Sequence, residues 1–350
     1  MDEKIRPIHF TATDGDPLEL HRPAFLVGNG INYADGCKLS WATLLVSILP
    51  DKKREELLGF NPGEEVSDDK NKNEELLKEK LAGLTYPEIA ELADLHNMDE
   101  ESTKRKIVNK IKEMETKDKD FDNNKKSLTD TFVNFCRNNH IPVLTTNFDH
   151  NLLSCLGIEK RKASSGTCEM PFWFYTEEEN KNPHKISYRY PFRAYFAKNE
   201  INPDDINNEF AVWYVHGTKR YINSICVNNI DYARNIAEID KLIRNKEQIE
   251  NSEWEGKNSW INIFMTNDLV ILGLGLDSEE TDLRWLLRER YVYLQQMKQQ
   301  NQETPYTIYI YSKDSNKDKI PVGKEALFKS LGIKCVPMET DDIYKLKYLK

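Results

Sequence analysis

Four short segments of the chain combine glycine or small polar residues with side chains that can take part in chemistry. They are Gly28-Asn29-Gly30-Ile31-Asn32, Thr145-Thr146-Asn147-Phe148-Asp149, His216-Gly217 and Gly273-Leu274-Gly275-Leu276-Asp277. Glycines allow tight turns and let the backbone come close to a ligand. Asn147 carries an amide that both donates and accepts hydrogen bonds, and His216 carries a base that titrates near neutral pH. These two residues are the candidate catalytic pair.

Each segment taken alone also has a purely structural explanation. Gly28 and Gly30 form only part of the G-x-G-x-x-G dinucleotide fingerprint, so they could simply make a strand-to-helix turn. Asn147 is also a candidate helix cap, and a lone histidine such as His216 is more often structural than catalytic. The last segment could serve tight packing of a helix on a sheet, with its aspartate as the helix cap. The functional interpretation therefore requires that the segments meet.

Each of the four segments follows an apolar run that predicts a buried strand. Such runs occur at 24–27, 142–145, 212–215, 224–227, 269–272, 306–311 and 334–337. Nearly continuous apolarity favours parallel strands covered on both faces, and helical patterns between the runs favour an α/β, Rossmann-like fold with a mainly parallel sheet. Because ligands bind such sheets at the carboxyl ends of the strands, we expect the four segments to converge on one cleft.

The clearest helical pattern follows Asp277. Leu283, Leu286 and Leu287 begin a repeat of three- and four-residue steps, which is typical of an amphipathic helix. Asp277 and Glu280 resemble a capping box, so we predict that this helix begins directly after Asp277.

Residues from about 51 to about 126 depart from the strand-and-helix alternation, because they are dense in Lys, Glu, Asp and Asn and contain no convincing strand. Apolar residues recur there at helical spacing, for example Leu77, Leu81 and Leu84. We therefore predict a charged helical insertion after the first core strand, within a single domain that spans residues 1–350. The charge run from Lys112 to Lys126 is interpreted as a solvated helix and loop, with a partner-binding surface as the alternative.

Composition narrows the classes of protein to consider. The 350-residue chain has a formal net charge of -9, which argues against direct binding to nucleic acid. We see no signal peptide and no apolar segment long enough to cross a bilayer. The six cysteines are scattered without a Cys-x-x-Cys pair. Reduced thiols and a cytoplasmic location are therefore expected.

The order of the four segments resembles the prokaryotic sirtuin-like family. The resemblance is to its divergent branch, whose members are NAD⁺-consuming effectors of anti-phage defence, and it includes two further motifs. They are Ser40-Trp41-x-x-Leu44-Leu45 and Asp282-Leu283-Arg284-Trp285-Leu286-Leu287. The resemblance covers residues from about 25 to about 45 and from about 142 to about 287, and it leaves the insertion outside.

The resemblance implies a role for each matching position. Asn147 matches the family's catalytic asparagine and His216 its catalytic histidine. The resemblance also implies positions for NAD⁺ binding, which extend from the phosphate and ribose site through the nicotinamide end to the adenosine end. They are Gly28, Asn29, Gly30, Ile31, Asn32, Thr146, Asp149, Gly273, Gly275 and Asp277. Two of these depart from the family's pattern: many members have alanine at the position of Asn29, and serine is frequent near that of Asn32.

The cysteines bear on the reaction. Deacetylases of the wider superfamily carry a zinc module with two Cys-x-x-Cys pairs, whose thiolates form a Cys₄ structural zinc site. Here the closest cysteines are Cys155 and Cys168, so we expect no zinc and no cofactor beyond NAD⁺ as substrate. Because no groove for acetyl-lysine is then implied, water is the expected acceptor of the ADP-ribosyl group. The resemblance then implies hydrolysis of NAD⁺ to nicotinamide and ADP-ribose, without a metal.

Uncontrolled hydrolysis of NAD⁺ would kill the cell that makes the protein. The chain shows no obvious second sensor domain, so we expect control by a companion regulatory or sensor protein, by homo-oligomerisation, or by both, with the insertion as the docking surface. Two other functions stay open: an ADP-ribosyltransferase that uses the same pocket, and a non-catalytic sensor of NAD⁺ or ADP-ribose. The presence of both Asn147 and His216 argues against the sensor, because binding alone requires neither.

Overall fold

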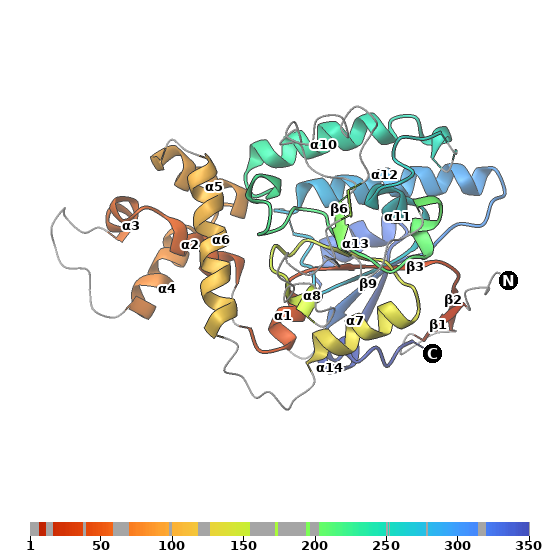
Figure 1. Cartoon of the computed structure of the whole chain (residues 1–350), viewed down its shortest axis with the longest axis horizontal. Coiled ribbons are helices and arrows are strands. Elements are labelled where there is room, and N and C mark those ends of the chain that lie inside the picture. Colours follow the sequence, from red (N-terminus) through yellow and green to blue (C-terminus); the bar gives the residue numbers. More distant parts are fainter. Residues whose placement is uncertain are drawn as a thin grey trace, which may run out of the picture.

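Six of the predicted runs form the parallel part of one sheet in the computed structural model of the chain (Figure 1). They are β3 (Pro23–Val27), β4 (Val143–Thr145), β7 (Val212–Tyr214), β8 (Asp268–Leu272), β9 (Thr307–Ser312) and β10 (Lys334–Met338). Two short strands, β6 (Ala194–Phe196) and β5 (Phe172–Trp173), continue the sheet beyond β7 in antiparallel orientation. The structure describes residues 7–11, 17–37, 40–58, 70–97, 100–117, 127–154, 172–173, 194–196, 203–249, 251, 253–277, 279–313 and 320–349.

The strands are ordered β10-β9-β8-β3-β4-β7-β6-β5 across the sheet. The first parallel strand in the sequence, β3, lies between β4 and β8 and runs parallel to both. From β3 the chain therefore extends the sheet in one direction through β4 and β7, and in the other through β8, β9 and β10. This is the doubly wound, Rossmann-like arrangement, so the predicted fold class is confirmed. In such folds ligands bind at the switch point, here the carboxyl ends of β3 and β8.

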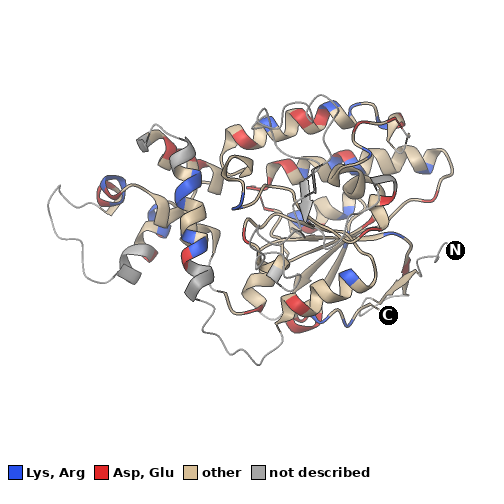
Figure 2. Ribbon diagram, in the orientation of Figure 1, with Lys and Arg blue, Asp and Glu red and all other residues tan. Residues whose placement is uncertain are grey.

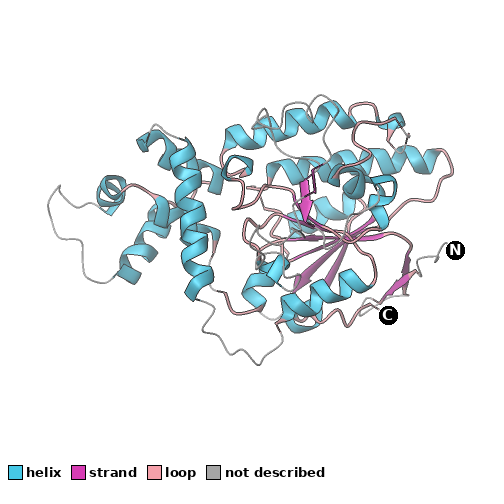
Figure 3. Ribbon diagram, in the orientation of Figure 1, coloured by secondary structure: helices cyan, strands magenta, loops and turns pink. Residues whose placement is uncertain are grey.

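Helices cover both faces of the sheet (Figure 3). Successive strand residues point to opposite faces, so Phe25 and Val27 pack in one apolar layer and Ala24 and Leu26 in the other. The helices of the first layer are α1 (Gly30–Ala34), α7 (Leu128–Asn138), α8 (Asn151–Ser154) and α14 (Thr340–Tyr344). Those of the second are α10 (Asn229–Ile243), α11 (Trp260–Thr266), α12 (Thr281–Gln299) and α13 (Val322–Ser330). Burial on both faces explains why the strands read as continuous apolar runs.

The helical insertion after the first core strand lies at one end of the molecule (Figure 1). Its helices are α2 (Trp41–Ile48), α3 (Asp51–Leu58), α4 (Lys70–Lys80), α5 (Tyr86–Asn97) and α6 (Glu100–Lys117). They share a separate apolar core that includes Leu45, Leu77 and Ile107. Because α2 belongs to this core, the insertion begins earlier than residue 51. Leu81 is buried whereas Leu84 is 42% exposed, and residues 118–126 of the charge run lie outside the described residues.

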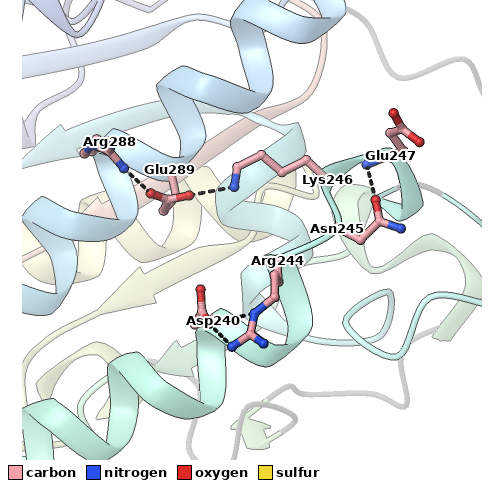
Figure 4. Close-up of polar contacts among 7 residues, drawn as sticks. All are labelled: Asp240, Arg244, Asn245, Lys246, Glu247, Arg288 and Glu289. Carbon is pink, nitrogen blue, oxygen red and sulfur yellow. Dashed lines mark hydrogen bonds and ion pairs between the residues drawn. The ribbon is translucent and has the colours of Figure 1, made fainter.

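Ion pairs between charged residues link α6 to α10, and the segment just after α10 to α12. Figure 2 shows basic residues recurring along α6 and residues of both signs along α10. A buried ion pair joins these two helices, with Lys104 Nζ 2.9 Å from Asp231 Oδ1. Just after α10, Lys246 in the 3₁₀ helix η6 (Lys246–Gln248) donates to Glu289 of α12 at 2.6 Å, and Arg288 pairs with the same carboxylate (Figure 4). Helix α10 is thus held between the insertion and α12.

Residues 224–227 form no strand, contrary to the prediction. After the 3₁₀ helix η5 (Ile222–Ser224) the chain runs irregularly, with Ile225, Cys226 and Val227 buried. The Cys226 N–H donates to the His216 carbonyl oxygen at 2.9 Å, and Ile225 and Val227 pack in the core of the insertion. The run is apolar because it is buried between the insertion and the loop after β7, not because it pairs in the sheet.

Helix α12 begins at Thr281, later than a cap at Asp277 implies. The Glu280 carboxylate accepts a hydrogen bond from the Asp277 N–H at 3.1 Å, which is half of the predicted capping box. The Asp277 side chain, however, pairs with Lys324 Nζ at 2.8 Å. Asp277 is therefore not the cap of α12, and its carboxylate instead joins the turn after β8 to α13.

The remaining elements lie beside the sheet. Strands β1 (Ile8–Phe10) and β2 (Leu18–Leu20) form an antiparallel pair, and Phe10 bridges Leu349 near the other end of the chain. A 3₁₀ helix, η4 (Pro203–Asn208), precedes β7. Among the described helices, none is both long and apolar enough to cross a membrane.

Candidate active site

A cavity of about 320 Å³ lies where the carboxyl ends of the parallel strands meet the helical insertion. Its wall is formed by the loops after β3, β4, β7 and β8, by the residues just before α12, by the insertion, and by the segment from Cys226 to Tyr232 of α10. The lining residues are Asn29, Gly30, Tyr33, Ser40, Trp41, Leu45, Tyr86, Thr146, His216, Cys226, Val227, Tyr232, Gly273, Leu274, Gly275, Asp277, Glu279 and Glu280. The cavity therefore occupies the switch point of the sheet, and its volume is in the range of small-molecule sites.

Glycines at the switch point are required by the close approach of two turns. A Cβ atom on Gly30 would lie 2.5 Å from the Gly273 Cα atom, and one on Gly28 would lie 2.4 Å from the Gly273 carbonyl oxygen. The Gly30 N–H donates to that same oxygen at 2.8 Å. Gly273 has a φ of 63°, a left-handed conformation that favours glycine. These residues hold the turns after β3 and β8 together, and Gly30 and Gly273 also line the cavity.

His216 is the imidazole of the cavity wall and is only 4% exposed. Its Nε2 lies 3.1 Å and 3.3 Å from the two carboxylate oxygens of Asp282, at the start of α12. The ring of Tyr232 from α10 packs edge-on against the imidazole, with centroids 5.4 Å apart. An ionised carboxylate only accepts hydrogen bonds, so Nε2 must carry the proton. In the neutral ring the unprotonated nitrogen is then Nδ1, and this atom is the candidate base.

His216 and Glu280, both on the cavity wall, have shifted pKa values. Burial lowers the pKa of His216, but the charge and hydrogen bond of Asp282 raise it more, so that its pKa lies above 6.5. Burial and the nearby Asp277 carboxylate raise the pKa of Glu280 to about 7, although His216 and Lys324 oppose this shift. Glu280 therefore changes charge close to neutral pH, and Asp282 favours the charged form of His216, as is common for acid–base residues of active sites.

Asn147 does not line the cavity, although its neighbour Thr146 does. Its Nδ2 donates to the Gly28 carbonyl oxygen at 3.3 Å, and the residue is 3% exposed. It does not cap the following helix, since the Asn151 N–H at the start of α8 is bound by Asp149 at 2.9 Å. Asn147 and His216 each follow a register pair of neighbouring strands by two residues, and such strands are only about 4.8 Å apart. The predicted catalytic pair is therefore brought to the same part of the site.

A second polar cluster fixes the turn after β3. Asn32 Nδ2 donates to Asn29 Oδ1 and to Asp149 Oδ2, each at 2.8 Å. Asn151 Nδ2 donates in turn to Asn32 Oδ1 at 3.0 Å. Ile31 is fully buried in the apolar core. The side chains of Ile31, Asn32 and Asp149 thus stabilise the loops around the cavity and do not line it.

Lys324 of α13 is the cation next to the predicted adenosine end. Its ammonium donates to the Gly275 carbonyl oxygen and lies 2.8 Å from Asp277 Oδ1. It also lies over the Tyr309 ring, 5.9 Å from the centroid. The Asp277 carboxylate, expected from the resemblance to take part in NAD⁺ binding, is therefore already paired with a lysine, although the residue remains on the cavity wall.

The structure divides the predicted site residues into two groups. Those that line the cavity are Asn29, Gly30, Thr146, His216, Gly273, Gly275 and Asp277. Those that lie outside its wall are Gly28, Ile31, Asn32, Asn147 and Asp149.

Sequence reasoning missed Glu280 and Asp282 as site residues. Glu280 was interpreted as part of a capping box, and Asp282 belonged to a family motif without an assigned role. Acidic residues at a helix start ordinarily complement the helix dipole, so their local pattern carries no sign of chemistry. Only the motif at Asp282 could have drawn attention to it. Among the described residues, no group of three or more His, Cys, Asp or Glu side chains is arranged to hold a metal, and Cys155 and Cys168 lie outside them.

The sirtuin-like resemblance remains an interpretation of short motifs. In comparisons with known proteins, no family model matches the chain and no curated protein matches it significantly. A functional proposal therefore depends on the cavity itself and on the chemistry of the residues around it.

Proposed function

We propose that this protein is an NAD⁺ glycohydrolase that releases nicotinamide and ADP-ribose. The proposal depends on one observation, the convergence of the strand-end segments on a cavity that His216 lines at the switch point of a doubly wound sheet. Dinucleotides bind at this place in such folds. The segments that converge there are those whose order resembles the sirtuin-like NAD⁺-consuming family.

The cavity wall suits a ligand with planar rings and ribose hydroxyls. The aromatic residues on it are Tyr33, Trp41, Tyr86 and Tyr232, and such rings offer flat apolar surface for nicotinamide or adenine. The Thr146 hydroxyl and the Glu280 carboxylate are on the same wall. These groups can hydrogen-bond ribose hydroxyls.

The proposed reaction breaks the bond between nicotinamide and C1′ of the ribose. The electron pair of that bond leaves with nicotinamide, which departs as a neutral molecule, and positive charge develops on the ribose. The oxygen of a water molecule then bonds to C1′ while Nδ1 of His216 accepts a proton from it, a contribution of about 10²- to 10⁴-fold in rate. The ionised carboxylate of Glu280 stabilises the developing positive charge. His216 afterwards returns the proton to solvent.

Asn147 supports this reaction from outside the cavity wall. Its bond to the Gly28 carbonyl oxygen fixes the turn that carries Asn29 and Gly30 to the cavity wall. Orientation of the reacting groups contributes strongly to catalysis, so we assign Asn147 a positioning role.

We also propose that NAD⁺ cleavage is controlled through the helical insertion. Trp41 and Leu45 of α2 and Tyr86 of α5 form part of the cavity wall, so a companion protein or a second copy bound there would alter the site. The family resemblance further implies a cytoplasmic anti-phage effector that acts by depleting NAD⁺.

The test is a product assay on the purified protein. NAD⁺ is incubated over a range of protein concentrations, with and without lysate of phage-infected cells, and the products are separated by chromatography. We expect equal amounts of nicotinamide and ADP-ribose, their loss in His216→Ala, and their retention in His9→Ala, a matched change at an exposed histidine. Labelled ADP-ribose that stays on protein would indicate a transferase. Binding of NAD⁺ without release of nicotinamide under every condition would indicate a sensor.

A further inference from the structure

Asp282 is a buried carboxylate with an unusual set of partners. It is 2% exposed, and its oxygens accept hydrogen bonds from His216 Nε2 at 3.1 Å, Asn235 Nδ2 at 2.8 Å and the Leu283 N–H at 2.8 Å. Among the described residues, no lysine or arginine forms an ion pair with it, and His216 is its one potential cation. Asp282 itself is not on the cavity wall, so it can act on a ligand only through His216.

A buried carboxylate in this position has two effects on an imidazole. It keeps the proton on Nε2, which leaves Nδ1 unprotonated, and it stabilises the imidazolium that forms when Nδ1 accepts a proton. Asn235, from α10, donates to Oδ2, the carboxylate oxygen that also lies nearer to Nε2. The pairing of α10 with α12 therefore sets the orientation of Asp282 and, through it, that of the histidine.

We propose that Asp282 is a positioning residue that fixes the tautomer of His216, and that Asn235 anchors it. This inference deepens the proposed NAD⁺ hydrolysis and depends on it for its catalytic consequence. The tautomer itself does not depend on the identity of the substrate.

The first test replaces Asp282 with asparagine, which preserves its size. All three partners of Asp282 approach as donors, whereas a carboxamide has one accepting oxygen and one donating NH₂ group. With its oxygen held by the Leu283 N–H, which donates to Oδ1, Asp282→Asn places the NH₂ group at the position of Oδ2, toward Nε2, and moves the ring proton to Nδ1. We expect kcat to fall by about 10²- to 10⁴-fold with little change in KM. Asp240→Asn, an exposed aspartate paired with Arg244 on α10, is the matched control.

Nitrogen NMR of the imidazole supplies a readout that needs no turnover. The signals of His216 are identified by difference from His216→Gln among the seven histidines of the chain. The wild type should show a protonated Nε2 and Asp282→Asn a protonated Nδ1. Asn235→Leu keeps the carboxylate but removes its anchor, so we expect a smaller loss of kcat and a mixture of tautomers, even if the asparagine variant fails to fold.

The pH profile gives a further check. The titratable groups around the imidazole are Asp282, Glu280, Tyr232 and Cys226. Burial raises the pKa of Tyr232 and Cys226, so both are neutral near pH 7. Loss of the Asp282 charge should move the acid limb of kcat/KM to lower pH, and Asp240→Asn should leave it in place.

The outcomes separate this inference from the proposed function. A wild-type His216 protonated on Nδ1, or an unchanged tautomer and pH profile in Asp282→Asn, would overturn the positioning role even if NAD⁺ is cleaved. Absence of nicotinamide release from a wild type whose Nε2 is protonated would overturn the proposed function while leaving the tautomer assignment intact.

Discussion

Glu280 illustrates how the fold alters the ionisation of a single residue. Its pKa is raised from 4.5 to about 7, first by burial and then by Asp277. The folded chain therefore holds this proton more tightly than the unfolded chain does. The contribution of Glu280 to the free energy of unfolding is then highest at low pH and is lost as pH rises from about 4.5 through about 7.

We predict that Glu280→Gln, which cannot ionise, removes this loss. From about pH 5 to about pH 8 the Tm of the wild type should fall relative to that of the variant. Thermal unfolding in matched buffers measures the difference. Glu279→Gln, which removes another carboxylate from the same wall, should retain the wild-type pH dependence. Parallel curves for the wild type and Glu280→Gln would show that Glu280 is not the titrating group.

Asn147→Ala should separate positioning from stability. The change removes one neutral hydrogen bond, to the Gly28 carbonyl oxygen, so we expect a loss of about 0.5–1.5 kcal/mol in the free energy of unfolding. Turnover per folded molecule should fall by more than this loss of stability explains, because the turn that carries Asn29 is no longer held in place. Asn139→Ala is the control, since it removes the same kind of amide-to-carbonyl bond, to the Phe135 carbonyl oxygen on α7, at an exposed position. Full activity of Asn147→Ala would refute the positioning role.

At the scale of elements, α10 connects the insertion to the candidate active site. Its first turn carries Asp231, which is paired with Lys104 of α6, and Tyr232, which packs against His216. Asn235, one turn later, holds Asp282. Displacement of the insertion relative to α10 would therefore change the contacts of the His216 imidazole.

Removing one partner of a buried ion pair typically lowers the free energy of unfolding by about 3–5 kcal/mol. We predict that Lys104→Met has an effect at the lower end of this range. The lower end is expected because Asp231 also accepts the Val227 N–H at 3.0 Å and lies near a helix N-terminus. Urea denaturation measures the effect. Lys110→Met, on the same helix but in an exposed pair with Glu113, should cost under about 1 kcal/mol. Equal costs for the two lysines would contradict this account.

At the scale of the whole molecule, the two ends of the sheet have different tasks. The carboxyl ends of β3, β4, β7 and β8 lie at the cavity, whereas Arg290 of α12 binds the chain at the amino ends of β8 and β9. This guanidinium is 1% exposed and donates to the carbonyl oxygens of Phe264, Asn267 and Tyr306 and to the Thr307 hydroxyl. Burial lowers its pKa to about 10, so it remains charged at neutral pH.

Arg290→Met should therefore destabilise the fold strongly without touching the chemistry. Each carbonyl oxygen left without a partner costs about 1–3 kcal/mol, so a large drop in Tm is expected by calorimetry. Activity per folded molecule, measured well below the Tm, should match the wild type. A specific loss of kcat in well-folded Arg290→Met would show that the two ends of the sheet are coupled.

Local patterns were sufficient to predict the six parallel strands, the helical character of the insertion and the segments that meet at the cavity, but not the short antiparallel strands β1, β2, β5 and β6. A strand such as β8 is apolar on both faces, and that property can be read from consecutive residues. The glycines at 28, 30 and 273 marked turns for a similar reason, since close backbone approach tolerates no side chain. Residues 224–227 misled the prediction because burial by a distant segment produces the same apolar signal as burial in a sheet.

The sequence by itself thus determined the fold class and pointed to His216 and Asn147, because strand burial and turn chemistry depend on neighbours in the chain. Only the tertiary structure decided which groups face one another. His216 and Asp282 are 66 positions apart, and they meet because β8 returns to the middle of the sheet and sets α12 across the end of β7. The tertiary structure also places Asn147 outside the cavity wall and pairs the Asp277 carboxylate with Lys324. Contacts of that range depend on the order of the strands, which no local pattern contains.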